Sequence, residues 1–129
     1  MPAKTFPYKY LALFYALVIF AVSSIPQATP PFGFKLEDKV LHFIEYAIFS
    51  FFLFLALYAS GREFLRKHVF LLSSLIGMVY AVSDEIHQKF VPGRQSEFLD
   101  FVADCLGIVI VQIVIWLYLR RKRKRLTTV

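Results

Sequence analysis

The chain has 129 residues, of which 58% are hydrophobic, and it carries a formal net charge of +6. A soluble domain of this size buries only roughly 60–70% of the surface that its unfolded chain exposes, so it could not hide so much apolar surface. This composition excludes an ordinary soluble enzyme, a disordered chain and a collagen-like chain. The single cysteine, Cys105, excludes an intrachain disulfide framework and a cysteine-built zinc site. The sequence therefore predicts one membrane domain covering residues 1–129.

Four apolar segments each approach the roughly 20 residues that cross a hydrocarbon core. They cover residues 8–25, 40–60, 69–91 and 98–119. We predict that all four are helices, because an open sheet leaves backbone groups unsatisfied in lipid. The connections are short: residues 27–39 with Pro30, Pro31 and Gly33, residues 61–68, and a turn at Pro92-Gly93-Arg94. The predicted fold is an all-α polytopic membrane protein with four transmembrane helices.

The basic residues are unevenly divided between the two predicted sides. Eleven fall on one side, namely Lys4, Lys9, Arg62, Arg66, Lys67 and the six-residue run 120–125, and four on the other, namely Lys35, Lys39, Lys89 and Arg94. Basic residues accumulate on the cytoplasmic side, so we predict that both termini, including a basic tail at residues 120–129, are cytoplasmic. Such a tail after an apolar segment is typical of a topology anchor, and no nucleic-acid partner is predicted. A cleaved signal peptide in the first segment is the alternative, although its apolar stretch is long for one.

The acidic residues show the opposite division. Eight of nine fall on the outer side: Glu37, Asp38, Glu45, Asp84, Glu85, Glu97, Asp100 and Asp104. An ionisable group inside a span costs at least about 2.5–3.5 kcal/mol at its centre, so it usually faces a partner or a water-filled cavity. In the third segment, Asp84 and Glu85 lie roughly 10 Å below Val91 at 1.5 Å per residue. His42 and Glu45 in the second segment and Asp100 and Asp104 in the fourth lie at a similar depth. Three predicted helices therefore carry polar groups at the same level, in the outer third of the membrane.

Helical spacing places these groups on one face of each helix. His42 shares a face with Glu45 and Tyr46, and Asp84 with Gln88. In the fourth segment, Glu97, Asp100, Asp104 and Gly107 form one stripe. We predict that the three faces meet in a polar, net acidic cavity open to the outside.

These residues form a pattern that resembles the VanZ-like family. The pattern is Lys39-x-x-His42-Phe43-x-x-Tyr46, Ser83-Asp84-Glu85-x-x-Gln88-x-Phe90-x-Pro92-Gly93-Arg94 and Asp100-x-x-x-Asp104-x-x-Gly107, together with Ser23-Ser24-Ile25-Pro26. The resemblance covers nearly the whole chain. It implies a small protein of the bacterial cytoplasmic membrane, related to a founding member that confers low-level teicoplanin resistance. Family members usually have asparagine where this chain has Asp104. The aspartate side chain can still form hydrogen bonds, and it adds a potential negative charge.

Each candidate residue has a functional and a structural interpretation. Candidate catalytic residues are His42, Glu45, Asp84 and Glu85, and candidate ligand-binding residues are Lys39, His42, Tyr46, Asp84, Glu85, Gln88, Arg94, Asp100 and Asp104. The structural interpretation is interhelical hydrogen bonding. For Arg94, the alternatives are a bidentate grip on a phosphate and a salt bridge to Glu97 or Asp100. Carboxylates suit Mg²⁺ or Ca²⁺, but no diagnostic ligand spacing is present, so neither a metal nor a cofactor is predicted.

Two main hypotheses about function remain open. In the first, the outer site binds a cell-envelope ligand, such as a lipid-linked cell-wall precursor or a glycopeptide, and lowers antibiotic susceptibility. In the second, the protein is a membrane-embedded enzyme acting on an outer-leaflet or polyprenyl-linked lipid, with His42 as general base and Asp84 or Glu85 as a second group. Ion- or proton-coupled transport is a third hypothesis. Membrane lipids are partners in all three.

Overall fold

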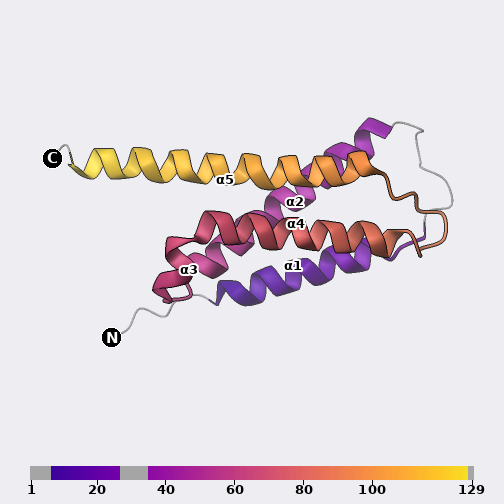
Figure 1. Cartoon of the computed structure of the whole chain (residues 1–129), viewed down its shortest axis with the longest axis horizontal. Coiled ribbons are helices and arrows are strands. Elements are labelled where there is room, and N and C mark those ends of the chain that lie inside the picture. Colours follow the sequence, from indigo (N-terminus) through magenta and orange to yellow (C-terminus); the bar gives the residue numbers. More distant parts are fainter. Residues whose placement is uncertain (1–6, 27–34, 128–129) are drawn as a thin grey trace.

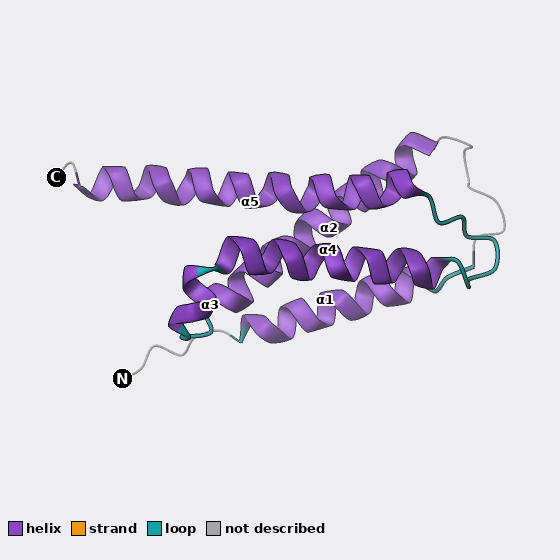
Figure 2. Ribbon diagram, in the orientation of Figure 1, coloured by secondary structure: helices purple, strands orange, loops and turns teal. Residues whose placement is uncertain are grey.

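The structure, a computed structural model, describes residues 7–26 and 35–127. All regular structure in these residues is helical, which confirms the predicted all-α class (Figure 2). Four long helices run along the length of the molecule and one short helix connects two of them (Figure 1). They are α1 (Tyr8–Ser23), α2 (Lys35–Tyr58), α3 (Glu63–Lys67), α4 (Val69–Gln88) and α5 (Phe98–Thr127).

Three of the helices are long and apolar enough to cross a membrane: Leu36–Tyr58, Val69–Gln88 and Phe98–Thr127. The first predicted span forms a shorter apolar helix of 16 residues, about 24 Å long at 1.5 Å per residue. Many large apolar side chains on the bundle are exposed, among them Phe14, Leu17 and Val79. These surfaces suit contact with lipid.

The helix bounds differ from the predicted spans at several ends. Helix α2 begins at Lys35, earlier than the predicted span. Helix α5 continues through the basic run to Thr127, because the Lys, Arg and Leu residues of that run favour helix formation. Residues 61–68, predicted as a plain link, contain α3. The third helix ends at Gln88, just before the predicted turn, in which Gly93 has a positive φ of 77°. The predicted breakers Pro30, Pro31 and Gly33, like Lys4, lie outside the described residues.

The two ends of the bundle carry different parts of the chain. The start of α1, the end of α5 and α3 lie toward the same end of the molecule, with α5 extending furthest, and we call this the tail end (Figure 1). The opposite end, which we call the loop end, holds the start of α2 and residues 89–97 between α4 and α5 (Figure 1). The loop end is where the candidate residues of α2, α4 and α5 come within reach of one another.

The most extensive helix contact is between α2 and α5. Gly107 makes this contact close, since a Cβ atom there would collide with the carbonyl oxygen of Phe43 and make a tight contact with the amide nitrogen of Ala47. Further along, the Gln112 side chain donates to Ser50 Oγ at 2.7 Å. A second contact joins α1 to α4, where the Tyr80 hydroxyl donates to the Ala16 carbonyl at 2.5 Å. Backbone contact and buried polar bonds together fix how the helices meet.

Candidate functional site

Lys39 joins the first turns of α2 and α5 at the loop end. Its ammonium lies 2.7 Å from Asp100 Oδ1 and 3.0 Å from Glu97 Oε2. The Asp100 side chain is 1% exposed, whereas Lys39 and Glu97 are partly exposed. A buried carboxylate is costly without a positive partner, so Lys39 compensates Asp100 from the solvent side.

One helical turn deeper, His42 of α2 pairs with Asp104 of α5. His42 Nδ1 lies 3.0 Å from Asp104 Oδ1, and the two side chains are 6% and 0% exposed. Because an ionised carboxylate only accepts hydrogen bonds, Nδ1–H is the donor. This bond orients the imidazole ring and directs Nε2 away from Asp104.

Glu85 brings α4 into the same region. Its Oε2 accepts a 2.6 Å bond from the Ser96 hydroxyl, which lies in the loop between α4 and α5. His42, Glu85 and Asp104 are all buried, and each offers one potential ligand atom within 4.8 Å of the other two. Three helices therefore meet here, as the spacing of their polar residues predicted.

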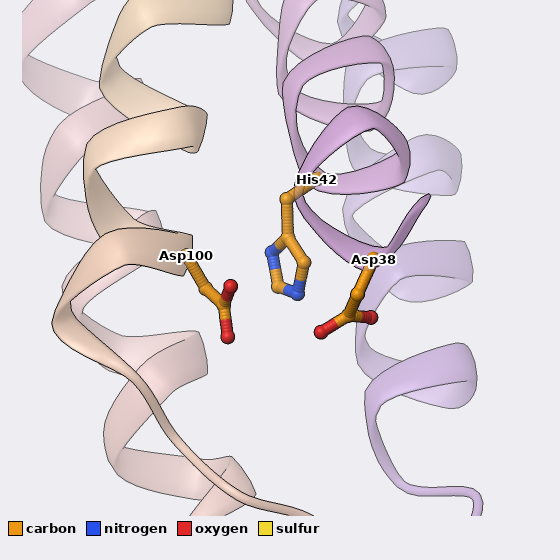
Figure 3. A group of neighbouring side chains, drawn as sticks. All are labelled: Asp38, His42 and Asp100. Carbon is orange, nitrogen blue, oxygen red and sulfur yellow. The ribbon is translucent and has the colours of Figure 1, made fainter. Parts of the chain in front are cut away.

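A second group of three surrounds the other side of the same histidine. Asp38, His42 and Asp100 offer potential ligand atoms within 4.8 Å of one another. Figure 3 shows the two carboxylates on either side of the His42 ring. Imidazole with carboxylates is a donor set that a divalent cation accepts. Each group already contains a residue with a partner in the chain, because Lys39 pairs with Asp100 and His42 pairs with Asp104. The sequence predicts no metal here, and this stays a prediction.

We refer to these residues together as the loop-end cluster: Asp38, Lys39, His42, Glu85, Ser96, Glu97, Asp100 and Asp104. Its distinctive feature is unsatisfied hydrogen-bonding capacity. Glu85 Oε1, Asp100 Oδ2 and Asp104 Oδ2 are buried oxygens with no partner in the described structure. Such atoms are rare in native proteins because each costs free energy. The cluster can therefore accept further hydrogen bonds.

Asp84 and Gln88 belong to a different contact. Gln88 donates to Asp84 Oδ2 at 3.1 Å within α4, and its amide also lies 3.4 Å from Ser23 Oγ at the end of α1. Both side chains are buried. The adjacent carboxylates of Asp84 and Glu85 thus take part in separate hydrogen bonds, and the bonds of Asp84 lie toward α1.

Tyr46 and Glu45 lie next along the same face of α2. Tyr46 is fully buried against the rings of Phe49 and Tyr80, and its hydroxyl has no partner within the described chain. Glu45 is half-buried. Of the predicted face, His42 and Tyr46 therefore point into the bundle and Glu45 lies at its margin.

Arg94 has a contact that neither predicted interpretation included. Its guanidinium donates to two carbonyls at the end of α1, Val22 O at 2.9 Å and Ile25 O at 3.2 Å. Glu97 and Asp100 pair instead with the ammonium of Lys39. Arg94 therefore ties the loop between α4 and α5 to the end of α1, where carbonyls lack helical partners.

Arg94→Lys is expected to lower the free energy of unfolding by about 1 kcal/mol, because one ammonium cannot reproduce both directed guanidinium bonds. Detergent-induced unfolding in mixed micelles, followed by circular dichroism, measures this change. Arg62→Lys, at an exposed position of the tail end, is the matched control. Equal stability of the two variants would contradict this role for Arg94.

The predicted open cavity receives no support from this packing. Most candidate side chains are buried and bonded to one another, including His42, Asp84, Gln88 and Asp100. A pocket of about 270 Å³ opens beside the cluster between α4 and α5, with Glu85, Ser96 and Glu97 on its polar side and Val82, Ile86, Phe98 and Phe101 among its apolar residues. Any ligand that reaches Glu85 by this route passes apolar walls.

Asp38, Ser96 and Glu97 contribute to the cluster but were not among the candidate site residues. The sequence holds a signal for two of them, since Asp38 is four residues before His42 and Glu97 begins the stripe of α5. Ser96 lies in a loop, where no periodicity predicts the direction of a side chain.

The sequence was compared with known protein families, curated proteins and solved structures. The model of the VanZ/LLP1 family matches residues 6–120. No curated protein and no solved structure matches. The family match includes every residue of the resemblance and of the loop-end cluster. With its apolar helices and this match over most of its length, the chain belongs to the VanZ-like family.

Proposed function

We propose that the chain crosses the bacterial cytoplasmic membrane four times and has both termini in the cytoplasm. The charges support this orientation, because eleven basic residues belong to the tail side and eight of nine acids to the other side. The length of α1, about 24 Å, is short for a span, and a bilayer accommodates a short span by local thinning. In this orientation the loop-end cluster belongs to the outer leaflet.

The function that the geometry supports best is binding of a cell-envelope ligand by the loop-end cluster. The observation that carries this proposal is that Glu85, Asp100 and Asp104 gather around His42, and that each of these carboxylates has one buried oxygen without a partner in the described residues. Because ionised carboxylates accept hydrogen bonds, the complementary ligand group is a donor, such as a sugar hydroxyl, an amide or an ammonium. Lipid-linked cell-wall precursors and glycopeptides offer all three.

The pocket between α4 and α5 supports a lipid-linked ligand over a fully soluble one. Its apolar residues, among them Ile86 and Phe101, suit a hydrocarbon chain, while Glu85 and Ser96 provide hydrogen-bonding groups at the same opening. At about 270 Å³ it lies just below the usual volumes for ligand pockets. It therefore suits part of a ligand, with the remainder in the membrane.

One observation favours a second candidate function, that of a membrane-embedded enzyme. The Asp104 carboxylate holds His42 Nδ1 at 3.0 Å, and an imidazole oriented in this way offers Nε2 as a general base. The substrate would be an outer-leaflet or polyprenyl-linked lipid. Glu85 is a better second group than Asp84, because Glu85 is grouped with His42 and has one unpartnered oxygen, whereas Asp84 is bonded to Gln88.

Expression of the wild-type chain in a sensitive Gram-positive host is expected to raise the minimal inhibitory concentration of teicoplanin, and Glu85→Gln is expected to abolish the increase. The amide removes the negative charge and keeps the shape of the side chain. Glu37→Gln, an exposed position of α2, is the matched control and should keep the increase. All variants are compared at equal membrane levels.

An increase that persists in Glu85→Gln would contradict a role for the cluster, and no increase with the wild type would contradict glycopeptide protection. Lipid extracts of the same cells separate the two candidate functions. An enzyme predicts a product that disappears completely in His42→Gln, whereas binding predicts a graded loss of retained ligand without any new lipid.

A further inference from the structure

A groove of about 670 Å³ lies at the tail end, opposite the loop-end cluster. It is formed by the end of α2, by α3, by the start of α4 and by the last turns of α5. Phe54, Phe70 and Leu119 contribute apolar surface to it. The groove therefore joins segments that are distant in the sequence.

Four basic side chains converge on this groove from two directions. Arg66 and Lys67 come from α3, and Lys122 and Arg123 come from α5, against one acid, Glu63. In residues 7–26 and 35–127, no side-chain salt bridge is found for any of the four basic residues. The groove therefore has a net positive charge that the salt bridges of the described residues do not neutralise.

The groove lies at the level where a membrane surface is expected. Helix α5 has 30 residues, so it is about 45 Å long and exceeds a hydrocarbon core of about 30 Å. Trp116 stacks under the Arg120 guanidinium, 5.1 Å from the ring centroid, and Tyr118 is exposed beside it. Trp and Tyr concentrate at the boundary between headgroups and hydrocarbon. The apolar part of the groove therefore continues into the acyl region, and its basic part faces the headgroups.

We propose that this groove binds an anionic phospholipid. The guanidinium and ammonium groups would hold the phosphate, since Arg fits phosphate oxygens bidentately and Lys acts as a point charge. The aromatic and aliphatic walls would contact the glycerol and the first acyl carbons. Basic pockets between transmembrane helices are known to bind lipid headgroups of this kind. The site is independent of the function proposed for the loop-end cluster.

The single tryptophan of the chain provides the test. Trp116 shares a helix face with Leu119 and Arg123, three and seven residues further on, so a lipid in the groove lies near its ring. The purified protein is reconstituted in phosphatidylcholine bilayers with a fixed fraction of either brominated phosphatidylglycerol or brominated phosphatidylcholine. We expect stronger quenching of Trp116 fluorescence by the brominated phosphatidylglycerol.

Two double variants with equal charge change separate the groove from general attraction to the tail. Arg66→Gln with Arg123→Gln removes two groove residues and should reduce the preference for the anionic lipid about fivefold for each residue removed. Arg121→Gln with Arg125→Gln removes two basic residues that do not line the groove and should leave most of the preference. Far-ultraviolet circular dichroism checks that both variants keep their helices.

Equal losses in the two double variants, or equal quenching by both brominated lipids in the wild type, would overturn the proposal. Soluble glycerol phosphate distinguishes a lipid from a free phosphate as the occupant. We expect it to leave the quenching by brominated phosphatidylglycerol unchanged. Recovery of fluorescence on adding glycerol phosphate would assign the groove to a soluble phosphate and overturn the lipid site.

Discussion

Gly107→Ala is expected to destabilise the folded bundle by about 3 kcal/mol, at the upper end of the usual cost of overpacking. The added Cβ would collide with the carbonyl oxygen of Phe43 and make a tight contact with the amide nitrogen of Ala47. Both are backbone atoms of α2, so no side-chain rotation relieves the collision and the two helices must move apart. Detergent-induced unfolding followed by circular dichroism measures the loss.

Gly77→Ala is the matched control, because the three atoms nearest to a Cβ there all belong to the Ile108 side chain, the closest at 3.1 Å. A side-chain end can shift by a few tenths of an ångström, so this variant should lose much less stability. Similar stability of the two variants would show that close contact between α2 and α5 does not limit folding.

The same contact sets the distances in the loop-end cluster. Gly107 follows Asp100 and Asp104 on one stripe of α5, and that stripe faces Lys39 and His42 of α2. Moving the helices apart would lengthen both ion pairs. We therefore expect Gly107→Ala to weaken the ligand binding proposed for the cluster as well as stability.

Asp104→Leu is expected to cost about 3–5 kcal/mol of stability, the usual penalty for removing one partner of a buried pair. His42 would stay buried without an acceptor for its Nδ1–H. Asp104→Asn should cost much less, because the amide oxygen still accepts that hydrogen bond. This expectation agrees with the asparagine that the VanZ-like resemblance implies at this position.

A double-mutant cycle with His42→Leu tests whether the cost arises from the pair itself. Replacing both partners with apolar residues removes the buried polar groups together, so the double variant should be more stable than Asp104→Leu alone. Additive losses, measured by unfolding in mixed micelles, would mean that His42 and Asp104 are not energetically coupled. Circular dichroism of each single variant confirms that its helices form.

The helices and the polar stripe of α5 could be predicted from sequence, because both depend on local periodicity. Four apolar segments gave four long helices, and the spacing of Glu97, Asp100, Asp104 and Gly107 placed all four toward α2. The same periodicity does not predict the continuation of α5 through the basic run, because a run of charges marks the end of a membrane span but not the end of a helix.

Which side chains pair with one another, by contrast, depends on the rotation of each helix about its axis and on its offset along the neighbouring helix. Sequence spacing treated Asp84 and Glu85 as equivalent, yet adjacent residues on a helix point in directions about 100° apart. Packing therefore turned Glu85 toward His42 and Asp104, and Asp84 toward Gln88 and α1. Arg94 likewise found the end of α1, through a turn whose path no periodicity describes.

By itself, then, the sequence determined the membrane-suited helical class, the level of the polar groups and the family, because composition and period act within each segment. The tertiary structure alone decided which carboxylates share His42, that their free oxygens are buried, and that basic residues of α3 and α5 line one groove. These features arise between segments far apart in the chain. Their geometry follows from contacts such as Gly107 against α2, which fix the distance at which polar side chains meet.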